Sequence, residues 1–222
     1  MENKDYIKNI EGAERRYFAS EVRSQKLDES NTDALPTIEG YAAKFNSPTR
    51  IGWYYKYEEE ILPGAFDDVL NDDVRCLYNH DPNYVLARSV NGKGTLNLTV
   101  DAVGLKYSYV TPNRSFAEDL ADAIDKGDVS QSSFAFEIAE ETWIVGDPEK
   151  GILDKRQIKK FKKLYDVSPV TYPAYEDTEV AQRSIEGYKK TLNINVEEPT
   201  EVRADGQFTI YDAQVQINKN LM

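Results

Sequence analysis

Cysteine and histidine are almost absent from this chain of 222 residues, which contains one of each. The single cysteine, Cys76, excludes an internal disulfide bond and a zinc site built from cysteine pairs. The single histidine, His80, excludes sites that need several histidines, including the HExxH zinc helix. The chain therefore gives no sign of an oxidising compartment, and we expect neither a metal ion nor any other cofactor.

Positive charge and long apolar runs are also scarce. Lys and Arg number 27 against 39 Asp and Glu, a formal net charge of −12, which argues against a nonspecific nucleic-acid partner because phosphate contacts need a basic surface. No run approaches the ~20 apolar residues of a membrane span, and the N-terminus lacks the apolar core of a signal peptide. We therefore expect a soluble intracellular protein with no membrane partner.

The motifs of several large enzyme classes are missing too. The sequence contains no GxSxG nucleophile elbow, no GxxxxGK[ST] phosphate loop and no GxGxxG dinucleotide fingerprint. These absences argue against an α/β-hydrolase, a P-loop nucleotide-binding protein and a Rossmann-type dinucleotide-binding protein.

What the chain does contain is many short strand patterns separated by turns. Residues 96–100 and 105–109 alternate apolar and polar side chains around Gly104, which predicts a β-hairpin. Residues 116–126 have apolar side chains at helical spacing and predict a helix, and 65–71 (AFDDVLN) predict a second, shorter one. Many strands, two helices and no βαβ rhythm favour a barrel or a sandwich.

A serine hydrolase built on this chain would have to use His80 as its base, since no other histidine exists. Ser132 and Ser133 open the aromatic strand FAFEI, and Asp166 is the acid of the last core strand. Alternation places Ser132 in phase with Phe134, whereas Ser133 points to the opposite face. His80 at the end of the strand VRCLYNH and Asp166 also fit plain structural roles, as a satisfied polar residue and as a turn cap or lysine partner.

Three other features suggest a binding or catalytic site but are explained more simply by structural roles. The basic run 155–163 (KRQIKKFKK) fits a solvated hairpin edge better than a docking patch for an acidic partner. Asp72, Asp73 and Asp81 surround the histidine, but scattered acids with one histidine are a poor coordination sphere. Cys76 lies about 13 Å from the histidine along an extended strand, so we expect a small core residue and not a nucleophile.

Several short blocks occur in an order that resembles a known family. In chain order they are PGAF, NHD, a hairpin containing GL, a helix ending in KGDVSQSSFAF, and LYDVSPVTYPAY. Each block alone is weak, but the ordered set resembles the prohead serine proteases of tailed bacteriophages, the HK97 type. The resemblance covers roughly residues 38–183.

The resemblance implies a fold and a site. The fold is mainly β with helices: a closed or orthogonally packed antiparallel β-barrel of the herpesvirus assembly protease type, with two or more flanking helices. The family's histidine matches His80, its serine matches Ser133, and its acid matches Asp166. The family more often carries Glu at the last position, so the shorter Asp166 requires its strand to lie closer to His80. Oxyanion donors are implied in the loop near Ala174.

The resemblance also implies a function. The chain would be a serine endopeptidase that cleaves scaffold segments of capsid proteins, and itself, inside the immature phage capsid in the host cytoplasm. Its partners would be the major capsid protein or its scaffold segment, with the portal protein and a second copy of the chain as further candidates. The alternative is a catalytically inactive capsid assembly or scaffolding protein with the same barrel.

The sequence pattern divides the chain into three parts. Residues 1–36 form an N-terminal extension with one strand, 37–183 form the protease barrel, and 184–222 form a C-terminal extension that is either disordered or removed by self-cleavage.

Overall fold

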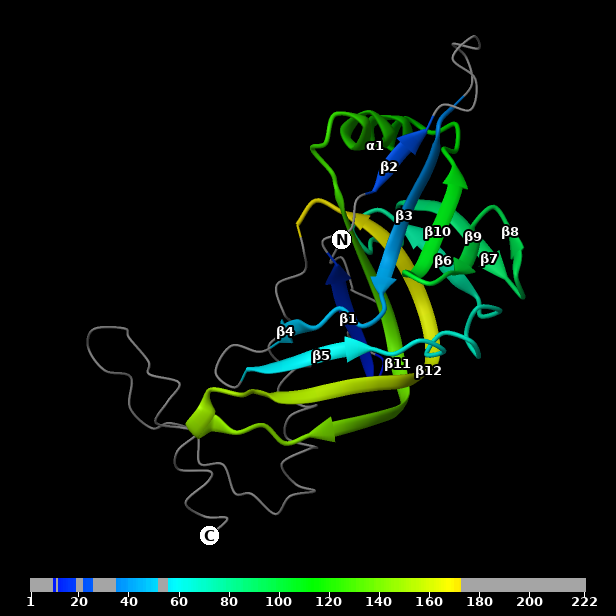
Figure 1. Cartoon of the computed structure of the whole chain (residues 1–222). Helices are drawn as coiled ribbons and strands as arrows, with labels where there is room; N and C mark the ends of the chain where they lie inside the picture. Colours follow the sequence, from blue (N-terminus) through cyan, green and yellow to red (C-terminus); the bar gives the residue numbers. More distant parts are fainter. Residues whose placement is uncertain (1–9, 11, 19–21, 26–34, 52–55, 173–222) are drawn as a thin grey trace. The chain divides into compact units, whose positions relative to one another are not determined.

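The computed structural model describes residues 10, 12–18, 22–25, 35–51 and 56–172, and the expected C-terminal extension lies outside them. Strands dominate the described residues (Figure 1). The strands are β1 (Ala13–Phe18), β2 (Arg23–Gln25), β3 (Thr37–Lys44), β4 (Thr49–Ile51), β5 (Tyr57–Ile61), β6 (Val74–Leu77), β7 (Val85–Val90), β8 (Lys93–Gly94), β9 (Asn97–Val100), β10 (Gly104–Val110), β11 (Gln131–Ile144) and β12 (Asp154–Val170). The helices are α1 (Ser115–Asp125) and a short 3-10 turn, η2 (Pro148–Lys150).

The described residues form two compact units, and the smaller one consists of Pro48–Glu60 and Thr142–Gln157. Within it, β4 pairs antiparallel with β5. The rings of Tyr57 and Trp143 lie 4.9 Å apart. Arg156 forms a buried ion pair with Glu59 at 2.9 Å. This unit carries none of the residues expected at the site.

The larger unit contains the expected site and is built on two sheets. The main path of the first sheet runs β1-β11-β12-β6-β7-β8, and the second runs β2-β3-β10-β9. The mainly β class is confirmed, but a closed, wholly antiparallel barrel is not: among the described strands neither sheet closes on itself. In addition, β12 pairs parallel with β6, with Asp166 opposite Arg75.

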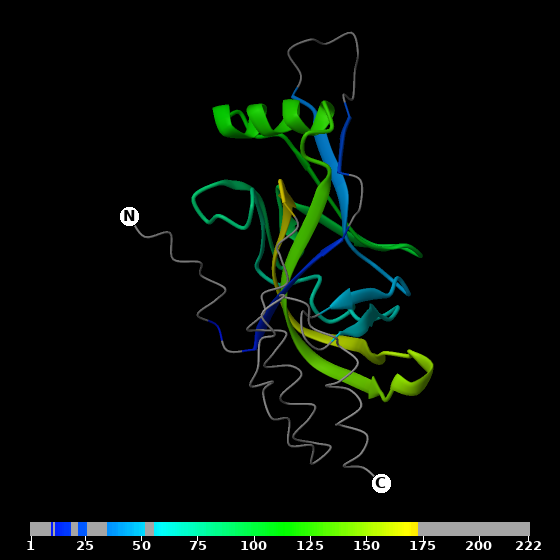
Figure 2. The ribbon, with the colours of Figure 1, turned by 90° about the vertical axis from the view of Figure 1, so that its left-hand side faces the viewer.

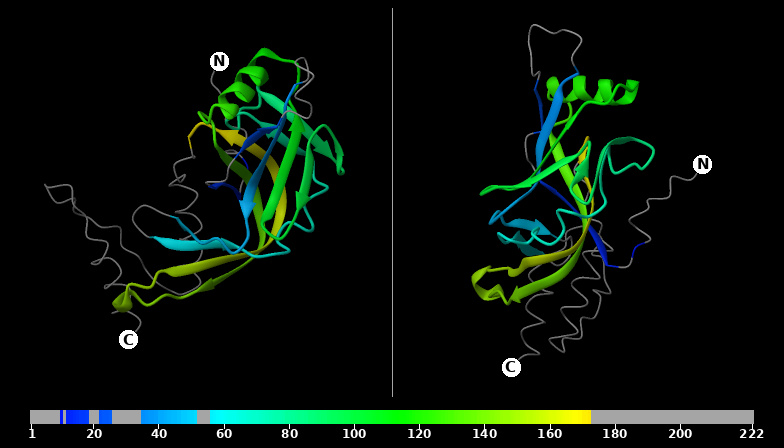
Figure 3. Two further views of the ribbon diagram at one scale, coloured as in Figure 1. Left: turned by 45° about the horizontal axis from the view of Figure 1, so that its top comes forward. Right: turned by 90° about the vertical axis from the view of Figure 1, so that its right-hand side faces the viewer.

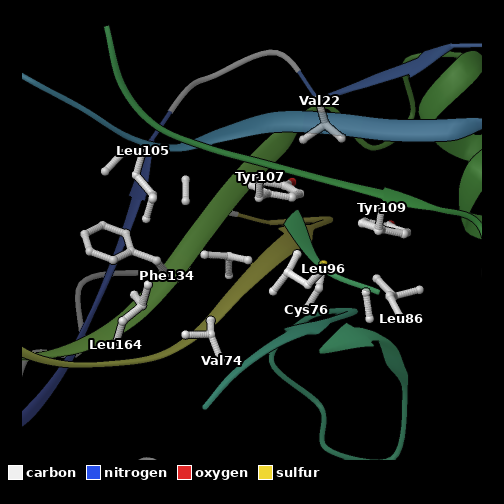
Figure 4. Close-up of a cluster of buried hydrophobic side chains, with 14 of the residues drawn as sticks. Val22, Val74, Cys76, Leu86, Leu96, Leu105, Tyr107, Tyr109, Phe134 and Leu164 are labelled. Carbon is white, nitrogen blue, oxygen red and sulfur yellow. The ribbon is translucent and has the colours of Figure 1, made fainter. Parts of the chain in front are cut away.

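The core of the larger unit lies between the two sheets. Figure 4 shows Leu105 and Tyr107 of the second sheet pointing towards Phe134 and Leu164 of the first. All four of these side chains are fully buried. Aromatic and branched side chains fill the space between the sheets, and protein interiors are close-packed. The strands that carry the site residues are therefore held in place by apolar packing.

The long helix lies close to its predicted position. It was expected at residues 116–126 and is found at Ser115–Asp125 as α1. Its buried face carries Ala117, Leu120, Ala121 and Ile124. Figures 1, 2 and 3 all show α1 at one end of the second sheet, beside β2. Gly127, with φ of +81°, then takes the left-handed conformation that ends helices.

The second predicted helix, at 65–71, is wrong. These residues form consecutive tight turns, with backbone bonds of the i to i+3 kind such as Val69 N–H to the Phe66 carbonyl at 3.1 Å. Phe66 is fully buried, and its ring lies 4.5 Å from that of Phe161. Burial of Phe66 and Val69 on the core therefore explains the apolar pattern that suggested a helix. No helix in the described part of the chain is both long and apolar enough to span a membrane.

The basic run 155–163 lies inside β12, and both edges of this part of β12 are covered: β12 pairs with β11 and also with β5, and Leu62 N–H donates to the Ile158 carbonyl at 3.0 Å. The expectation of a hairpin edge is therefore wrong for this segment. Its lysines are instead paired with carboxylates: Lys155 with Glu60, Lys159 with Glu140, Lys160 with Asp68, Lys162 with Glu137 and Lys163 with Asp72.

Cys76 lies in the core and not at the site. Its side chain is fully buried, and burial together with the charge of Asp166 raises the pKa of the thiol well above its ordinary value. The nucleophilic form of cysteine is the thiolate, so we predict that a thiol reagent modifies no cysteine in the folded protein. Titration with Ellman's reagent should detect the single thiol only after unfolding in guanidinium. Rapid reaction of the native protein would contradict this placement.

Candidate active site

The loop between β6 and β7 presents His80. β6 ends at Leu77, so His80 does not continue the strand as the sequence pattern suggested. Asn79 and His80 instead take left-handed backbone angles, with φ of 54° and 57°. Asparagine is one of the residues that tolerates this region, and the two angles turn the imidazole away from the direction of the strand.

Asn79 also fixes this loop to the end of β12. Its backbone N–H donates to the Pro169 carbonyl at 3.1 Å. Its side-chain oxygen accepts from the backbone N–H of Thr171 at 2.9 Å and from the Thr171 hydroxyl at 3.0 Å. The NHD block therefore contains a positioning residue, which sequence reasoning missed because its partners lie 92 positions further along the chain.

Hydrogen bonds within the loop also hold its conformation. Tyr78 N–H donates to the Tyr84 carbonyl at 3.1 Å, and Tyr84 N–H donates to the Asp81 carbonyl at 3.0 Å. The Asp81 carboxylate accepts from the backbone N–H and the side-chain amide of Asn83, each at 2.8 Å. Asp81 thus caps its own turn. Among the described residues no group of three or more His, Cys, Asp or Glu is placed to hold a metal ion.

β11 presents two adjacent serines to opposite faces, as the alternation predicted. Ser132 hydrogen-bonds the Tyr107 hydroxyl at 2.9 Å, on the core side. Ser133 Oγ lies 2.6 Å from Nε2 of His80, on the other side. Because successive strand residues face opposite ways, only Ser133 can reach the histidine from this strand.

Asp166 completes the arrangement from β12. Its Oδ1 lies 2.6 Å from Nδ1 of His80 and accepts a hydrogen bond from the Ser168 hydroxyl at 2.8 Å. The parallel pairing of β12 with β6 brings Asp166 opposite Arg75, on the strand that leads into the histidine loop. The 2.6 Å contact shows that the short side chain of an aspartate reaches the histidine from this strand.

The carboxyl of Asp166 is charged although it is buried. Its residue is only 2% exposed, and burial by itself raises the pKa of a carboxyl. The neighbouring His80, together with the charge of Arg15 and the hydrogen bond from Ser168, outweighs burial, so the pKa of Asp166 falls below its ordinary value. A negative charge therefore faces Nδ1 at neutral pH.

The structure thus brings together all three residues that the sequence singled out. The imidazole has a carboxylate at one nitrogen and a hydroxyl at the other, an arrangement in which it can take the hydroxyl proton and remain stabilised as an imidazolium. The expected oxyanion loop near Ala174 lies outside the described residues.

A hollow lies beside the histidine loop and was not anticipated. Its lining is mostly aromatic and apolar: Tyr78, Tyr84, Phe116, Asp119, Leu120 and Ala123. Tyr84 packs edge-on against Phe116, with ring centroids 5.2 Å apart. Tyr78 and Tyr84 stand at the two ends of the histidine loop, so the hollow is bounded by the segment that carries His80.

Comparison with known proteins identifies the family of the chain. Residues 20–191 match the family described as caudovirus prohead serine protease. The prohead protease of Enterobacteria phage HK97 is 30% identical over 162 residues, which cover 71% of this chain and 64% of that protein. The chain thus spans less than two thirds of that relative. The solved bacteriophage T4 capsid assembly protease aligns with 71% of this chain and 98% of its own, at 15% identity and a TM-score of 0.39. The family match covers most of the sequence and includes all three site residues, so the chain belongs to the prohead serine protease family of tailed phages.

Proposed function

We propose that this protein is a serine endopeptidase that cleaves capsid proteins during prohead maturation, with Ser133 as nucleophile, His80 as general base and Asp166 as the group that orients the base. The observation that carries the proposal is the unbroken chain of short contacts, 2.6 Å from Ser133 to His80 and 2.6 Å from His80 to Asp166. Membership of the prohead serine protease family supports it.

The chemistry proposed is acyl transfer in two steps. Ser133 Oγ attacks the carbonyl carbon of the scissile bond while Nε2 of His80 takes the hydroxyl proton. The charged Asp166 stabilises the imidazolium that forms, and His80 then gives the proton to the leaving amine. Water hydrolyses the acyl-enzyme with the same base. Backbone N–H groups have to stabilise the oxyanion, and each is worth about 3 kcal/mol in measured proteases.

The substrate we infer is a scaffold segment of the major capsid protein, and the place of action is the prohead inside the host cell. The family description, which names the prohead, supports this choice. Two further substrates are proposed: the portal protein and the extensions of this chain. A second copy of the chain is a further candidate partner, as a homodimer. The aromatic hollow beside the histidine loop is a candidate subsite for an apolar side chain of the substrate.

The direct test is incubation of the purified protein with its cognate capsid protein, followed by intact mass measurement. We expect fragments with the wild type, none with Ser133→Ala, and no effect of a chelator. The masses would also locate the cut. Fragments from both proteins, or their loss on chelation, would overturn the proposal in favour of another hydrolase.

The same experiment also tests the alternative of an inactive assembly protein. Such a protein could have lost the serine, the histidine or the acid without cost, whereas all three are present here and in contact. A wild-type protein that binds the capsid protein but never cuts it would favour the alternative.

A further inference from the structure

The N-terminal strand β1 covers the strand that carries Ser133. It is the outermost strand of the first sheet and pairs antiparallel with β11 over six positions, Ala13 opposite Glu137 through Phe18 opposite Ser132. In this register Tyr17 stands opposite Ser133. The edge of β11 beside the serine is therefore occupied by a segment of the same chain (Figure 1).

The backbone of β1 also contacts the serine hydroxyl itself. Ser133 Oγ donates to the Arg16 carbonyl at 2.9 Å while it lies 2.6 Å from Nε2 of His80. A hydroxyl has one proton, so donation to Arg16 withholds that proton from His80. In this geometry the Arg16 oxygen, and not its carbonyl carbon, faces Oγ, so the contact is a resting arrangement and not an attack on β1.

The covered site has no room for a second peptide. Ser133 has no exposed surface, and the side chains of His80 and Asp166 are only 7% and 3% exposed. A substrate carbonyl has to come within about 3 to 3.5 Å of the nucleophile. The backbone of Arg16 already lies at that distance from Oγ. A substrate can reach Ser133 only after this part of β1 has moved.

Besides its pairing with β11, β1 is held by the side chains of Ala13, Glu14 and Arg16, all of which are buried. Arg16 pairs with Glu14 of the same strand at 2.6 Å and lies over the ring of Phe136 at 5.7 Å. Ala13 packs against Ala135 in a small cluster apart from the main core. Edge strands that lie outside the main core are among the elements that can open locally without global unfolding.

We propose that the edge of β11 beside Ser133 is the docking edge for an extended substrate peptide, and that β1 is its resident occupant, which has to separate before substrate binds. The inference rests on the proposed function, because it takes Ser133 as the nucleophile. An incoming strand would regain the backbone hydrogen bonds that β1 gives up, as in other complexes where a peptide is added to a sheet edge. The partner this edge fits is thus an extended segment and not a folded surface.

An engineered disulfide bond between β1 and β11, which a reductant can break, tests whether β1 has to separate before substrate binds. We call such a disulfide a lock. Ala13 and Glu137 are directly opposite, and neither contacts the three site residues through an observed hydrogen bond, so Ala13→Cys with Glu137→Cys places two thiols at disulfide distance. Two rates are measured on the full-length protein. The first is the rate of labelling by a small fluorophosphonate, and the second is the rate of capsid-protein cleavage. We expect both rates to fall at least about ten-fold in the oxidised form relative to the same protein after reduction, because the lock removes the open population.

The controls separate this inference from the proposed function. The wild type, whose only cysteine is buried, should respond equally with and without reductant. A second lock, Arg15→Cys with Ala135→Cys, repeats the comparison two positions closer to Ser133. Equal rates for oxidised and reduced forms of both locked proteins would overturn the docking proposal while leaving Ser133 as the nucleophile. Absence of Ser133 labelling in the wild type and in both reduced variants would instead overturn the proposed function.

Discussion

Replacing Ser133 by alanine is expected to lower kcat for capsid-protein cleavage by about 10⁶-fold, the scale seen when a serine protease loses its nucleophile. The reason is geometric. Ser133 is the only hydroxyl that lies against Nε2 of His80 in the described part of the chain, at 2.6 Å. The measurement is the single-turnover rate of fragment formation by the purified variant, with the wild type alongside.

The neighbouring serine supplies a matched control. Ser132→Ala removes a buried hydroxyl that bonds the Tyr107 hydroxyl and does not face the histidine. We expect it to keep the rate of cleavage and to lose about 1 to 3 kcal/mol of unfolding free energy, because the buried Tyr107 hydroxyl loses this hydrogen-bond partner. If Ser132→Ala were inactive and Ser133→Ala active, the assignment of the nucleophile would be reversed.

Asp166→Asn is expected to lower kcat by about 10⁴-fold, as the equivalent change does in a measured Ser-His-Asp enzyme. Asp166 Oδ1 faces Nδ1 of His80 at 2.6 Å, and a neutral amide there neither holds the same tautomer nor stabilises the imidazolium. KM should change little, because this side chain is buried behind the histidine. A loss of less than about ten-fold would mean that Asp166 is not the orienting group.

The same variant should show a pH-dependent change in stability. The pKa of Asp166 is lower in the folded protein than its ordinary value of about 3.9, so its charge stabilises the fold above that pH. This contribution is lost as the pH falls through the lowered folded-state pKa. The unfolding free energy of the wild type should therefore exceed that of Asp166→Asn more at pH 7 than in strong acid. Urea unfolding measures this, with the exposed Asp125→Asn as the charge control. A gap that widens in acid would contradict it.

Local patterns made part of this fold predictable. The helix at Ser115–Asp125 and the hairpin of β9 and β10 follow from apolar periodicity and from turn residues close in sequence. The opposite facing of Ser132 and Ser133 follows from strand alternation alone. The order of the blocks around His80, Ser133 and Asp166 then predicted which residues meet, although alternation alone left their roles open.

Features that depend on distant contacts were not predictable in this way. The turns at 65–71 mimic a helix because Phe66 and Val69 are buried at a three-residue spacing. The left-handed backbone at His80 depends on the bonds of Asn79 to Thr171, and the parallel pairing of β6 with β12 joins segments about ninety residues apart. Likewise no local signal in residues 13–18 indicates that β1 lies on the strand of the nucleophile.

Ser133 as a nucleophile activated by His80 is the assignment on which the proposed function depends. The most direct test is to treat the full-length protein with a fluorophosphonate and to locate the adduct by peptide mass mapping. We expect one adduct, on the Oγ of Ser133, and its loss in His80→Ala. An adduct on another serine, or one on Ser133 that forms equally well without His80, would contradict it.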